Sequence, residues 1–224
     1  IYIDEYENID IMEIIEQMYT MNPHWEDVRY EYPFSRIQLQ TILDSMEKGM
    51  IISLIGPRRV GKTVLMKQTI QKLIDMGNDK RRILFFSFDD YRDEPINIIK
   101  HWKNELSLDL RAGKYWLFLD EIQYIENWAR KIKVIYDNYP NIAIFLSGSA
   151  SAKIRRGKES LGGREIIINV KPLLFSEYLK IKNIQPVSSE ILWSHYLNYM
   201  KRQLPALVMS DLDPHDYIKE IVNK

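Results

Sequence analysis

The sequence predicts an α/β protein in which a mostly parallel sheet is covered by helices on both faces. Five short apolar runs typical of buried strands alternate with segments whose apolar residues recur at helical spacing. The strand-like runs are 50–55, 82–88, 115–119, 142–146 and 166–170. Strands that alternate with helices in this way form parallel sheets with right-handed crossovers. A glycine-rich loop between the first strand and the helix that follows it supports the same fold class.

The helical segments account for most of the remaining chain. Their apolar spacing predicts helices over 3–20, 35–48, 64–74, 94–110 and 128–136. Ser35 is expected to cap the second of these helices and Gly49 to end it. From Pro172 onward the pattern is helical, with segments at 175–180, 188–201 and 214–224.

This order of elements predicts three parts. They are an N-terminal helical extension (1–34), an α/β core (35–171) and a small helical lid (172–224). The chain begins at Ile1 rather than Met and ends at Lys224 within a helical pattern, which suggests a fragment of a longer protein, with the lid cut short.

Composition excludes several classes of function. The formal net charge is zero, so no global field draws the protein to nucleic acid or membrane. The absence of cysteine excludes disulfides, thiol catalysis and cysteine-based metal sites, and it fits a reducing, cytoplasmic interior. The apolar stretches all fall short of the roughly 20 residues of a membrane span. The four histidines lack metal-ligand spacing.

The most informative motif is the sequence GPRRVGKT at residues 56–63, between the first strand and its helix. Gly56 and Gly61 allow backbone conformations that direct N–H groups at a phosphate chain, and the helix N-terminus adds its positive dipole. In this pattern Lys62 reaches the β- and γ-phosphates and the Thr63 hydroxyl ligates Mg²⁺. The expected nucleotide-binding residues are Gly56, Pro57, Arg58, Arg59, Val60, Gly61, Lys62, Thr63 and Val64.

Two acidic residues follow the strand at 115–119. Ligands bind at the carboxyl ends of strands in open α/β sheets, so Asp120 is placed to hold Mg²⁺ directly or through a water. Glu121 is placed to polarise an attacking water as a general base. An Asp-Glu pair can instead serve as acids at a helix N-terminus. The phosphate-loop motif upstream favours the catalytic interpretation.

Other nucleotide-binding classes fit less well. GTP-binding switch proteins usually carry N-K-x-D and D-x-x-G, and the sequence contains neither at the expected place. A transporter-type signature precedes the metal-binding strand, whereas the similar stretch 161–165 (LGGRE) follows it. Small-molecule kinases seldom place a glutamate directly after the metal-binding aspartate. The remaining class is that of ATPases with an added catalytic glutamate.

Six stretches of the chain resemble the archaeal-type ATPases of the AAA+/STAND group, which are related to origin-recognition-type ATPases. The matching stretches are NPHW at 22–25, GPRRVGKT at 56–63, LDEIQ at 119–123 with Trp128, LSGSA at 146–150, LGGR at 161–164 and PLLFSEYL at 172–179. They span about 22–179 in the order of the family. The resemblance implies an AAA+-like P-loop NTPase fold, ATP or ADP with Mg²⁺, and slow hydrolysis used as a switch.

The resemblance also implies further site residues. Ser147 matches a polar sensor that orients water or γ-phosphate, although its hydroxyl could equally cap the next turn. Arg164 matches a position that senses γ-phosphate or acts as an arginine finger, in cis or across a subunit interface; a surface salt bridge is the alternative. Pro205 falls where relatives carry G-x-P near the adenine, but Gln203 replaces the glycine and Pro205 could simply start a helix.

Possible partners are less defined. A homo-oligomer is possible, as is a DNA or protein partner bound through a C-terminal domain outside this chain. The basic cluster at 153–158 contacts DNA phosphates or is a solvated loop. The aromatic residues between Tyr30 and Phe34 stack on adenine or pack in the core. A signalling scaffold in which bound nucleotide locks an oligomer is the non-catalytic alternative.

Overall fold

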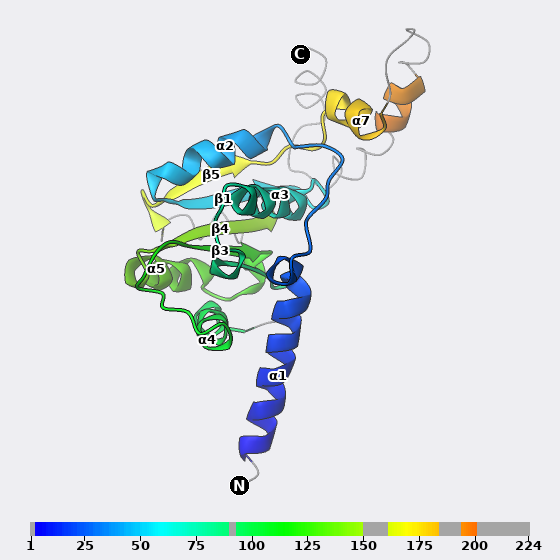
Figure 1. Cartoon of the computed structure of the whole chain (residues 1–224). Helices are drawn as coiled ribbons and strands as arrows, with labels where there is room; N and C mark the ends of the chain where they lie inside the picture. Colours follow the sequence, from blue (N-terminus) through cyan, green and yellow to red (C-terminus); the bar gives the residue numbers. More distant parts are fainter. Residues whose placement is uncertain (1–2, 90–92, 150–160, 184–193, 201–224) are drawn as a thin grey trace.

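The protein is built around a five-stranded sheet. The computed structural model describes residues 3–89, 93–149, 161–183 and 194–200, with side chains described from residue 12 onward. All neighbouring strands are parallel, in the order β2-β3-β4-β1-β5 (Figure 1). The strands are β1 (Ile51–Gly56), β2 (Ile83–Ser87), β3 (Tyr115–Asp120), β4 (Ile142–Ser149) and β5 (Glu165–Asn169).

Helices lie on both faces of this sheet. The helices of the described residues are α1 (Ile3–Met21), α2 (Gln38–Ser45), α3 (Lys62–Asp75), α4 (Pro95–Glu105), α5 (Trp128–Asn138) and α7 (Phe175–Ile181), of which α7 lies beyond the end of the sheet, and residues 194–200 are also helical. Short 3₁₀ turns occur at Pro23–Glu26, Met46–Lys48, Lys80–Arg82 and Ile122–Tyr124. Helices α1, α4 and α5 pack on one face of the sheet, and α2 and α3 pack on the other.

Two hydrophobic cores result from the alternation of side chains along buried strands. On β2, Phe86 joins the core beneath α1, α4 and α5, whereas its neighbour Phe85 joins the core beneath α2 and α3. In the second core Phe118 of β3 stacks on Phe145 of β4, with ring centroids 4.2 Å apart. Because both faces are covered, the strands read as continuous apolar runs in the sequence.

The structure confirms the α/β class and corrects several expected boundaries. Helix α2 begins at Gln38 with Ile37 at its N-cap, so the cap predicted at Ser35 is wrong. Helix α4 ends at Glu105 rather than near residue 110, and Ser107 has a positive φ of 51°. Strand β4 continues to Ser149, which pairs with Gly56, so residues 147–149 belong to the strand rather than to a following turn.

The C-terminal helices are described only in part. Phe175 and Tyr178 of α7 contact Tyr199, with ring centroids 5.3 and 5.7 Å apart. The Tyr199 hydroxyl donates a hydrogen bond to the Leu173 carbonyl at 2.5 Å. The expected helix at 214–224 lies outside the described residues, and the division into extension, core and lid stays a prediction.

Asn22 completes the hydrogen bonding of β2, which is an edge strand. Its side-chain oxygen accepts a hydrogen bond from the Phe85 N–H at 2.6 Å, and its side-chain nitrogen donates to the Phe85 carbonyl at 2.8 Å. The Asn22 amide thus imitates one residue of a neighbouring strand. This contact protects the edge against pairing with another chain and explains the first residue of the NPHW stretch.

The next residues of the NPHW stretch serve the same strand. His24 and Trp25 are buried and both contact the Ile83 carbonyl, at 3.1 and 2.8 Å. The other ring nitrogen of His24 lies 2.9 Å from the Tyr30 hydroxyl. These contacts hold the segment between α1 and α2 against the edge of the sheet. His24 therefore has a structural role that its spacing in the sequence did not indicate.

We expect His24 to make the protein less stable in mild acid. Burial lowers the pKa of His24 from 6.5 to about 4. Between these values the unfolded chain binds a proton that the folded protein excludes, so stability is full above pH 6.5 and falls as the pH decreases. The loss is at most about 1.4 kcal/mol per pH unit. Urea unfolding from pH 7 to 4.5 measures it. A His24→Gln variant should lose this component of the slope, and a His101→Gln control should retain it.

Candidate functional site

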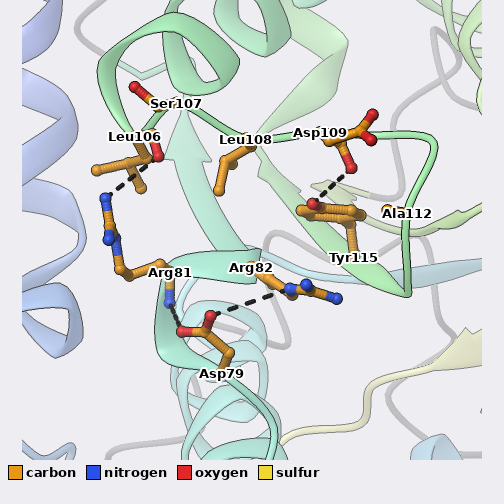
Figure 2. Close-up of a pocket in the computed structure, with 9 residues that line it drawn as sticks. All are labelled: Asp79, Arg81, Arg82, Leu106, Ser107, Leu108, Asp109, Ala112 and Tyr115. Atoms are coloured by element: carbon orange, nitrogen blue, oxygen red, sulfur yellow. Dashed lines mark hydrogen bonds and ion pairs between the residues drawn. The ribbon is translucent and has the colours of Figure 1, made fainter.

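One cavity, of about 210 Å³, lies at the amino-terminal edge of the sheet, where β2 and β3 begin (Figure 2). Its charged groups are already engaged by the protein. The Arg82 guanidinium lies 5.2 Å from the Tyr115 ring centroid and its Nε lies 3.9 Å from Asp79, while Arg81 donates to the Leu106 carbonyl at 3.2 Å. The residues singled out by the nucleotide motifs are at the opposite, carboxyl-terminal edge.

The phosphate-loop motif forms the turn between β1 and α3. Gly56 ends β1 beside Val170, the residue that follows β5. The two lie so close that a Cβ added at Gly56 would be 2.2 Å from the Val170 carbonyl oxygen. Gly61 is the N-cap of α3 with φ 90°, a conformation that glycine adopts without strain. Arg59 also has a positive φ, of 64°. The sequence therefore folds into a tight loop whose backbone precedes a helix N-terminus.

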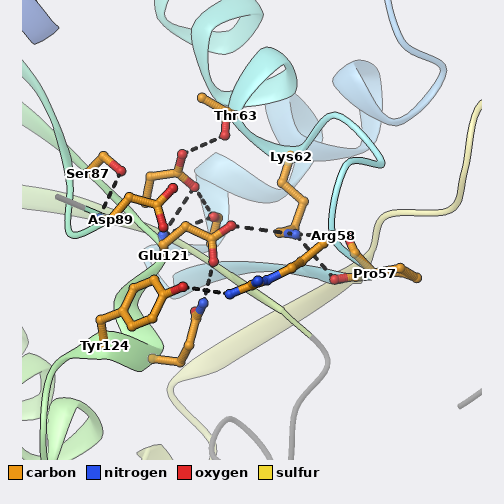
Figure 3. Close-up of polar contacts among 12 residues, drawn as sticks. Pro57, Arg58, Lys62, Thr63, Ser87, Asp89, Glu121 and Tyr124 are labelled. Carbon is orange, nitrogen blue, oxygen red and sulfur yellow. Dashed lines mark hydrogen bonds and ion pairs between the residues drawn. The ribbon is translucent and has the colours of Figure 1, made fainter. Parts of the chain in front are cut away.

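Lys62 lies inside this loop. Its side chain is buried, and its ammonium group donates hydrogen bonds to the Gly56 and Pro57 carbonyls at 3.2 and 3.0 Å. The nearest carboxylate is that of Glu121, 3.9 Å away (Figure 3). Burial lowers the pKa of Lys62, and the negative charges of Glu121 and Asp120 oppose that shift. A buried cation with weak carboxylate pairing is suited to an anionic ligand.

Three strand and helix ends bring a polar cluster together next to the loop. The Thr63 hydroxyl, in the first turn of α3, donates to Asp120 Oδ2 at 2.6 Å. Ser147 of β4 donates to the other oxygen of the same carboxylate, Oδ1. Both Asp120 and Ser147 are buried. The Ser147 hydroxyl, on strand β4, therefore orients Asp120 within the sheet, while the turn that it could instead cap lies outside the described residues.

Glu121 leaves the strand in an unusual backbone conformation. Its φ is 53°, in the left-handed region, and its N–H donates to Asp120 Oδ1 at 3.2 Å. This conformation turns the Glu121 side chain back toward Lys62 (Figure 3). The Gln123 side-chain amide donates to Glu121 Oε2. Gln123 is buried and holds one carboxylate oxygen of Glu121, while Lys62 lies nearer the other oxygen. The position of Gln123 two residues after Glu121 could have suggested this contact.

Two further groups border the site. Arg58 of the loop donates to the Tyr124 hydroxyl at 2.6 Å, so the loop is tied to the turn that follows β3. Asp89 lies just beyond β2, near Glu121, and its negative charge also acts to raise the pKa of Lys62 (Figure 3). Neither Tyr124 nor Asp89 was singled out from the sequence, because the segments that follow β1, β2 and β3 come together only in the folded sheet.

Arg164 is not part of this cluster. It immediately precedes β5, and its carbonyl accepts a hydrogen bond from the Ile51 N–H at the start of β1. It therefore lies at the amino-terminal edge, about 20 Å from the loop by the length of a six-residue strand. Its side chain is partly exposed and lies 3.6 Å from Asp137. A role for Arg164 in cis does not fit this position, and a role across an interface stays a prediction.

The remaining expected contacts divide into two groups. Pro205 and the basic cluster at 153–158 lie outside the described residues. Among the upstream aromatic residues, Tyr30 packs against the core beneath α2 and α3, and Lys67 lies 5.6 Å from its ring centroid. Tyr30 is therefore core packing, as one of the two interpretations held.

Comparison with known proteins now defines the family. Residues 48–179 match the family model described as an AAA domain, which is more than half of the chain. The chain belongs to the AAA domain family. Its matched segment contains the phosphate loop, the acidic pair after β3, Ser147 and most of α7. The parallel sheet with its covering helices is the P-loop NTPase fold of AAA+ type.

Relatives of this AAA domain include uncharacterized proteins. It is 30% identical over 183 residues to MJ1637 of Methanocaldococcus jannaschii, covering 79% of this chain and 38% of that protein. It is 27% identical over 179 residues to a protein of Haemophilus influenzae, covering 77% and 44%. The chain thus spans less than half the length of these relatives. A Walker-type ATPase of Pyrococcus abyssi is similar with a TM-score of 0.46 and 17% identity, covering 71% of this chain and 61% of that one.

The donor set at the loop fits a nucleotide with Mg²⁺. Mg²⁺ keeps several waters and is usually held by one or two carboxylates together with substrate phosphates. Thr63 and Asp120 supply a hydroxyl and a carboxylate already in contact with each other. Within the described parts of the chain, no cluster of three or more His, Cys, Asp or Glu side chains could hold a metal by itself. Over the same residues, every helix is too short or too polar to cross a membrane.

Proposed function

We propose that this AAA domain binds ATP together with Mg²⁺ and hydrolyses it slowly, as a molecular switch. The observation that carries the proposal is the convergence of four side chains at the carboxyl ends of β1, β3 and β4. They are Lys62, Thr63, Asp120 and Glu121. The Thr63 hydroxyl donates to Asp120 at 2.6 Å, and Lys62 lies 3.9 Å from Glu121. Ligands of open α/β sheets bind at this position. Each of the four residue types suits one part of a nucleoside triphosphate with its Mg²⁺.

The chain's own residues divide the work of binding. The loop backbone and the start of α3 would hold the phosphate chain, with Lys62 exchanging its loop carbonyl partners for phosphate oxygens. Thr63 and Asp120 would hold Mg²⁺, which would neutralise charge on the phosphate oxygens. Ser147 keeps the Asp120 carboxylate in a single orientation through its hydrogen bond. Arg58 and Tyr124 together fix the outer side of the loop.

Glu121 supplies the general base. A water that attacks the γ-phosphorus must lose a proton as the bond to ADP breaks, and the Glu121 carboxylate is placed beside Lys62 to accept it. Gln123 holds the other carboxylate oxygen and so limits the rotation of the side chain. Slow turnover is expected if the arginine that completes the site comes from a neighbouring copy, as proposed for Arg164.

The first test is ATP binding by the wild type and by a Lys62→Met variant. Methionine keeps most of the length of the side chain but removes the charge, so the expected result is a loss of affinity of about 10- to 100-fold, the range for one charged hydrogen bond. Titration with a fluorescent ATP analogue and Mg²⁺ measures it. Lys72→Met, on the exposed face of the same helix, is the matched control and should bind as the wild type. Equal affinity of all three proteins would contradict the proposal.

A nucleotide-locked scaffold of STAND type is distinguished by turnover rather than by binding. Such a scaffold would bind ATP and assemble without hydrolysing it. The left-handed backbone conformation of Glu121 brings its carboxylate beside Lys62, where Gln123 holds it. This arrangement favours the hydrolytic alternative. A DNA-associated ATPase is the further alternative, and the basic cluster that motivates it lies outside the described residues.

A further inference from the structure

A buried ion pair lies against the phosphate loop. Arg36 is 2% exposed and Glu177 is 6% exposed, and Arg36 Nε lies 3.1 Å from Glu177 Oε1. The two residues are 141 positions apart in the chain. Arg36 precedes α2 and Glu177 lies in the first turn of α7. Burial of two charges is costly unless each is fully hydrogen-bonded, so the arrangement of their partners indicates what the pair holds.

The Arg36 guanidinium makes three contacts to three different segments. Besides Glu177, it donates to the Val60 carbonyl of the phosphate loop at 2.5 Å and to the Lys171 carbonyl after β5 at 2.8 Å. Gly61 is packed against it, since an added Cβ at Gly61 would lie 2.9 Å from Arg36 Nη1. The planar guanidinium fork is suited to such simultaneous contacts, which the single ammonium group of lysine cannot reproduce.

The contact with Val60 fixes the direction of one loop amide. In a trans peptide the C=O and N–H bonds point to opposite sides. Because Arg36 binds the Val60 carbonyl, the Gly61 N–H is directed away from Arg36, toward the other side of the loop backbone. A loop that binds phosphate depends on N–H groups that face the ligand. Arg36 is therefore a positioning residue for the loop.

Glu177 connects the same arginine to the C-terminal helices. Its Oε2 accepts a hydrogen bond from the Leu174 N–H at 2.9 Å, at the start of α7, and its Oε1 accepts one from the Ile37 N–H at 3.1 Å. Helix α7 in turn packs through Phe175 and Tyr178 on Tyr199. A continuous set of polar and aromatic contacts thus runs from the loop to residues 194–200.

We propose that Arg36 and Glu177 couple the conformation of the phosphate loop to the placement of α7, so that nucleotide at the loop is reported to the C-terminal helices. The nucleotide part rests on the proposed function, whereas the mechanical link between loop and helix does not. The proposal gives α7 the role of an output element. It also explains why Glu177 and Arg36, both charged, occupy the interior rather than the surface.

The mechanical link is tested without nucleotide. Glu177→Gln removes the charge that holds Arg36, although Glu177 itself contacts α7 and Ile37 rather than the loop. Hydrogen exchange of the amides at 60–64 should become about tenfold faster, as expected for the loss of one charge-assisted hydrogen bond that orders the loop. Glu47→Gln, an exposed substitution on the turn after α2, is the control. Loop exchange equal to that of the control would overturn the proposal.

The nucleotide-dependent part uses a double variant that is expected to fold. Removing one partner of a buried pair is strongly destabilising, whereas replacing both by apolar residues is often neutral. In the wild type, ATP should slow the exchange of the amides at 174–181. In Arg36→Met/Glu177→Leu, affinity for ATP should fall by about tenfold, and saturating ATP should leave 174–181 unchanged. Protection of these amides as in the wild type would overturn the coupling.

The two experiments separate this proposal from the proposed function. A wild type that fails to bind ATP would contradict the nucleotide-binding function, while the exchange of loop amides in Glu177→Gln would still decide whether the link exists. A wild type that binds ATP, together with loop exchange that ignores Glu177, would contradict the link alone. Arg36→Lys separates charge from geometry. The amides at 60–64 should exchange faster in this variant than in the wild type, and exchange equal to that of the wild type would contradict the role given to the guanidinium group.

Discussion

Replacing Glu121 with glutamine is expected to reduce ATP turnover by about 10²- to 10⁴-fold while ATP binding is retained, since this range is typical for removal of a general base. The substitution keeps the size of the side chain and an acceptor oxygen. It removes the carboxylate that would take the proton from the attacking water. It also removes a negative charge 3.9 Å from Lys62, so phosphate binding should not weaken. Steady-state phosphate release and equilibrium binding of ATP with Mg²⁺ measure the two effects.

Glu126→Gln is the matched control for this substitution, because Glu126 follows in the same connection and is exposed. It should hydrolyse ATP as the wild type does. Normal turnover by Glu121→Gln would contradict the role as general base. Both proteins should be assayed over a range of concentrations, since specific turnover that rises with concentration would support completion of the site by a neighbouring copy through Arg164.

Replacing Gly56 with alanine is expected to destabilise the fold by about 3 kcal/mol or more, at the upper end of the cost of overpacking. The added methyl group would lie 2.2 Å from the Val170 carbonyl oxygen. The backbone at Gly56 and the backbone at Val170 are held together in the sheet, since the Val170 N–H donates to the Ile55 carbonyl at 2.7 Å. Relief of the contact therefore requires β1 and the exit of β5 to separate. Urea unfolding at constant pH measures the change.

A second glycine isolates the cause of this effect. Gly49 has a positive φ of 65° but open space around its Cα, so Gly49→Ala should cost about 1 kcal/mol from backbone strain alone. Similar losses for the two variants would show that the close approach of Val170 is not responsible. A Gly56→Ala variant that remained folded should also bind ATP less well, because the loop begins at this residue.

The strands could be predicted from local sequence because their environment is simple. The central strands lie between two layers of helices, so all residues of Ile51–Gly56 and of Tyr115–Asp120 are buried and the apolar runs are continuous. The boundaries of helices were less predictable. The apolar pattern of α4 continues past Glu105 to Leu106 and Leu110, which are buried in the turn that follows the helix rather than in the helix itself.

The candidate site was predictable where its residues are consecutive. The loop from Gly56 to Thr63 and the Asp120–Glu121 pair are local patterns whose chemistry follows from residue type and order. Gln123 was within a matched stretch, but its contact with Glu121 depends on the left-handed turn at that residue. Arg36 gave no such signal, because a single arginine in the first turn of the helix predicted over 35–48 is ordinarily a surface residue.

By itself, the sequence determined the α/β class, the phosphate loop and the acidic pair that makes this AAA domain a candidate ATPase. These features depend on periodicity and on residues that are neighbours in the chain. Tertiary structure alone placed Arg164 at the far edge of the sheet, brought Ser147 to Asp120, and joined Arg36 to Glu177. The physical reason is that strand order, and the packing of distant segments against one another, decide which side chains share a site, and neither is encoded in local spacing.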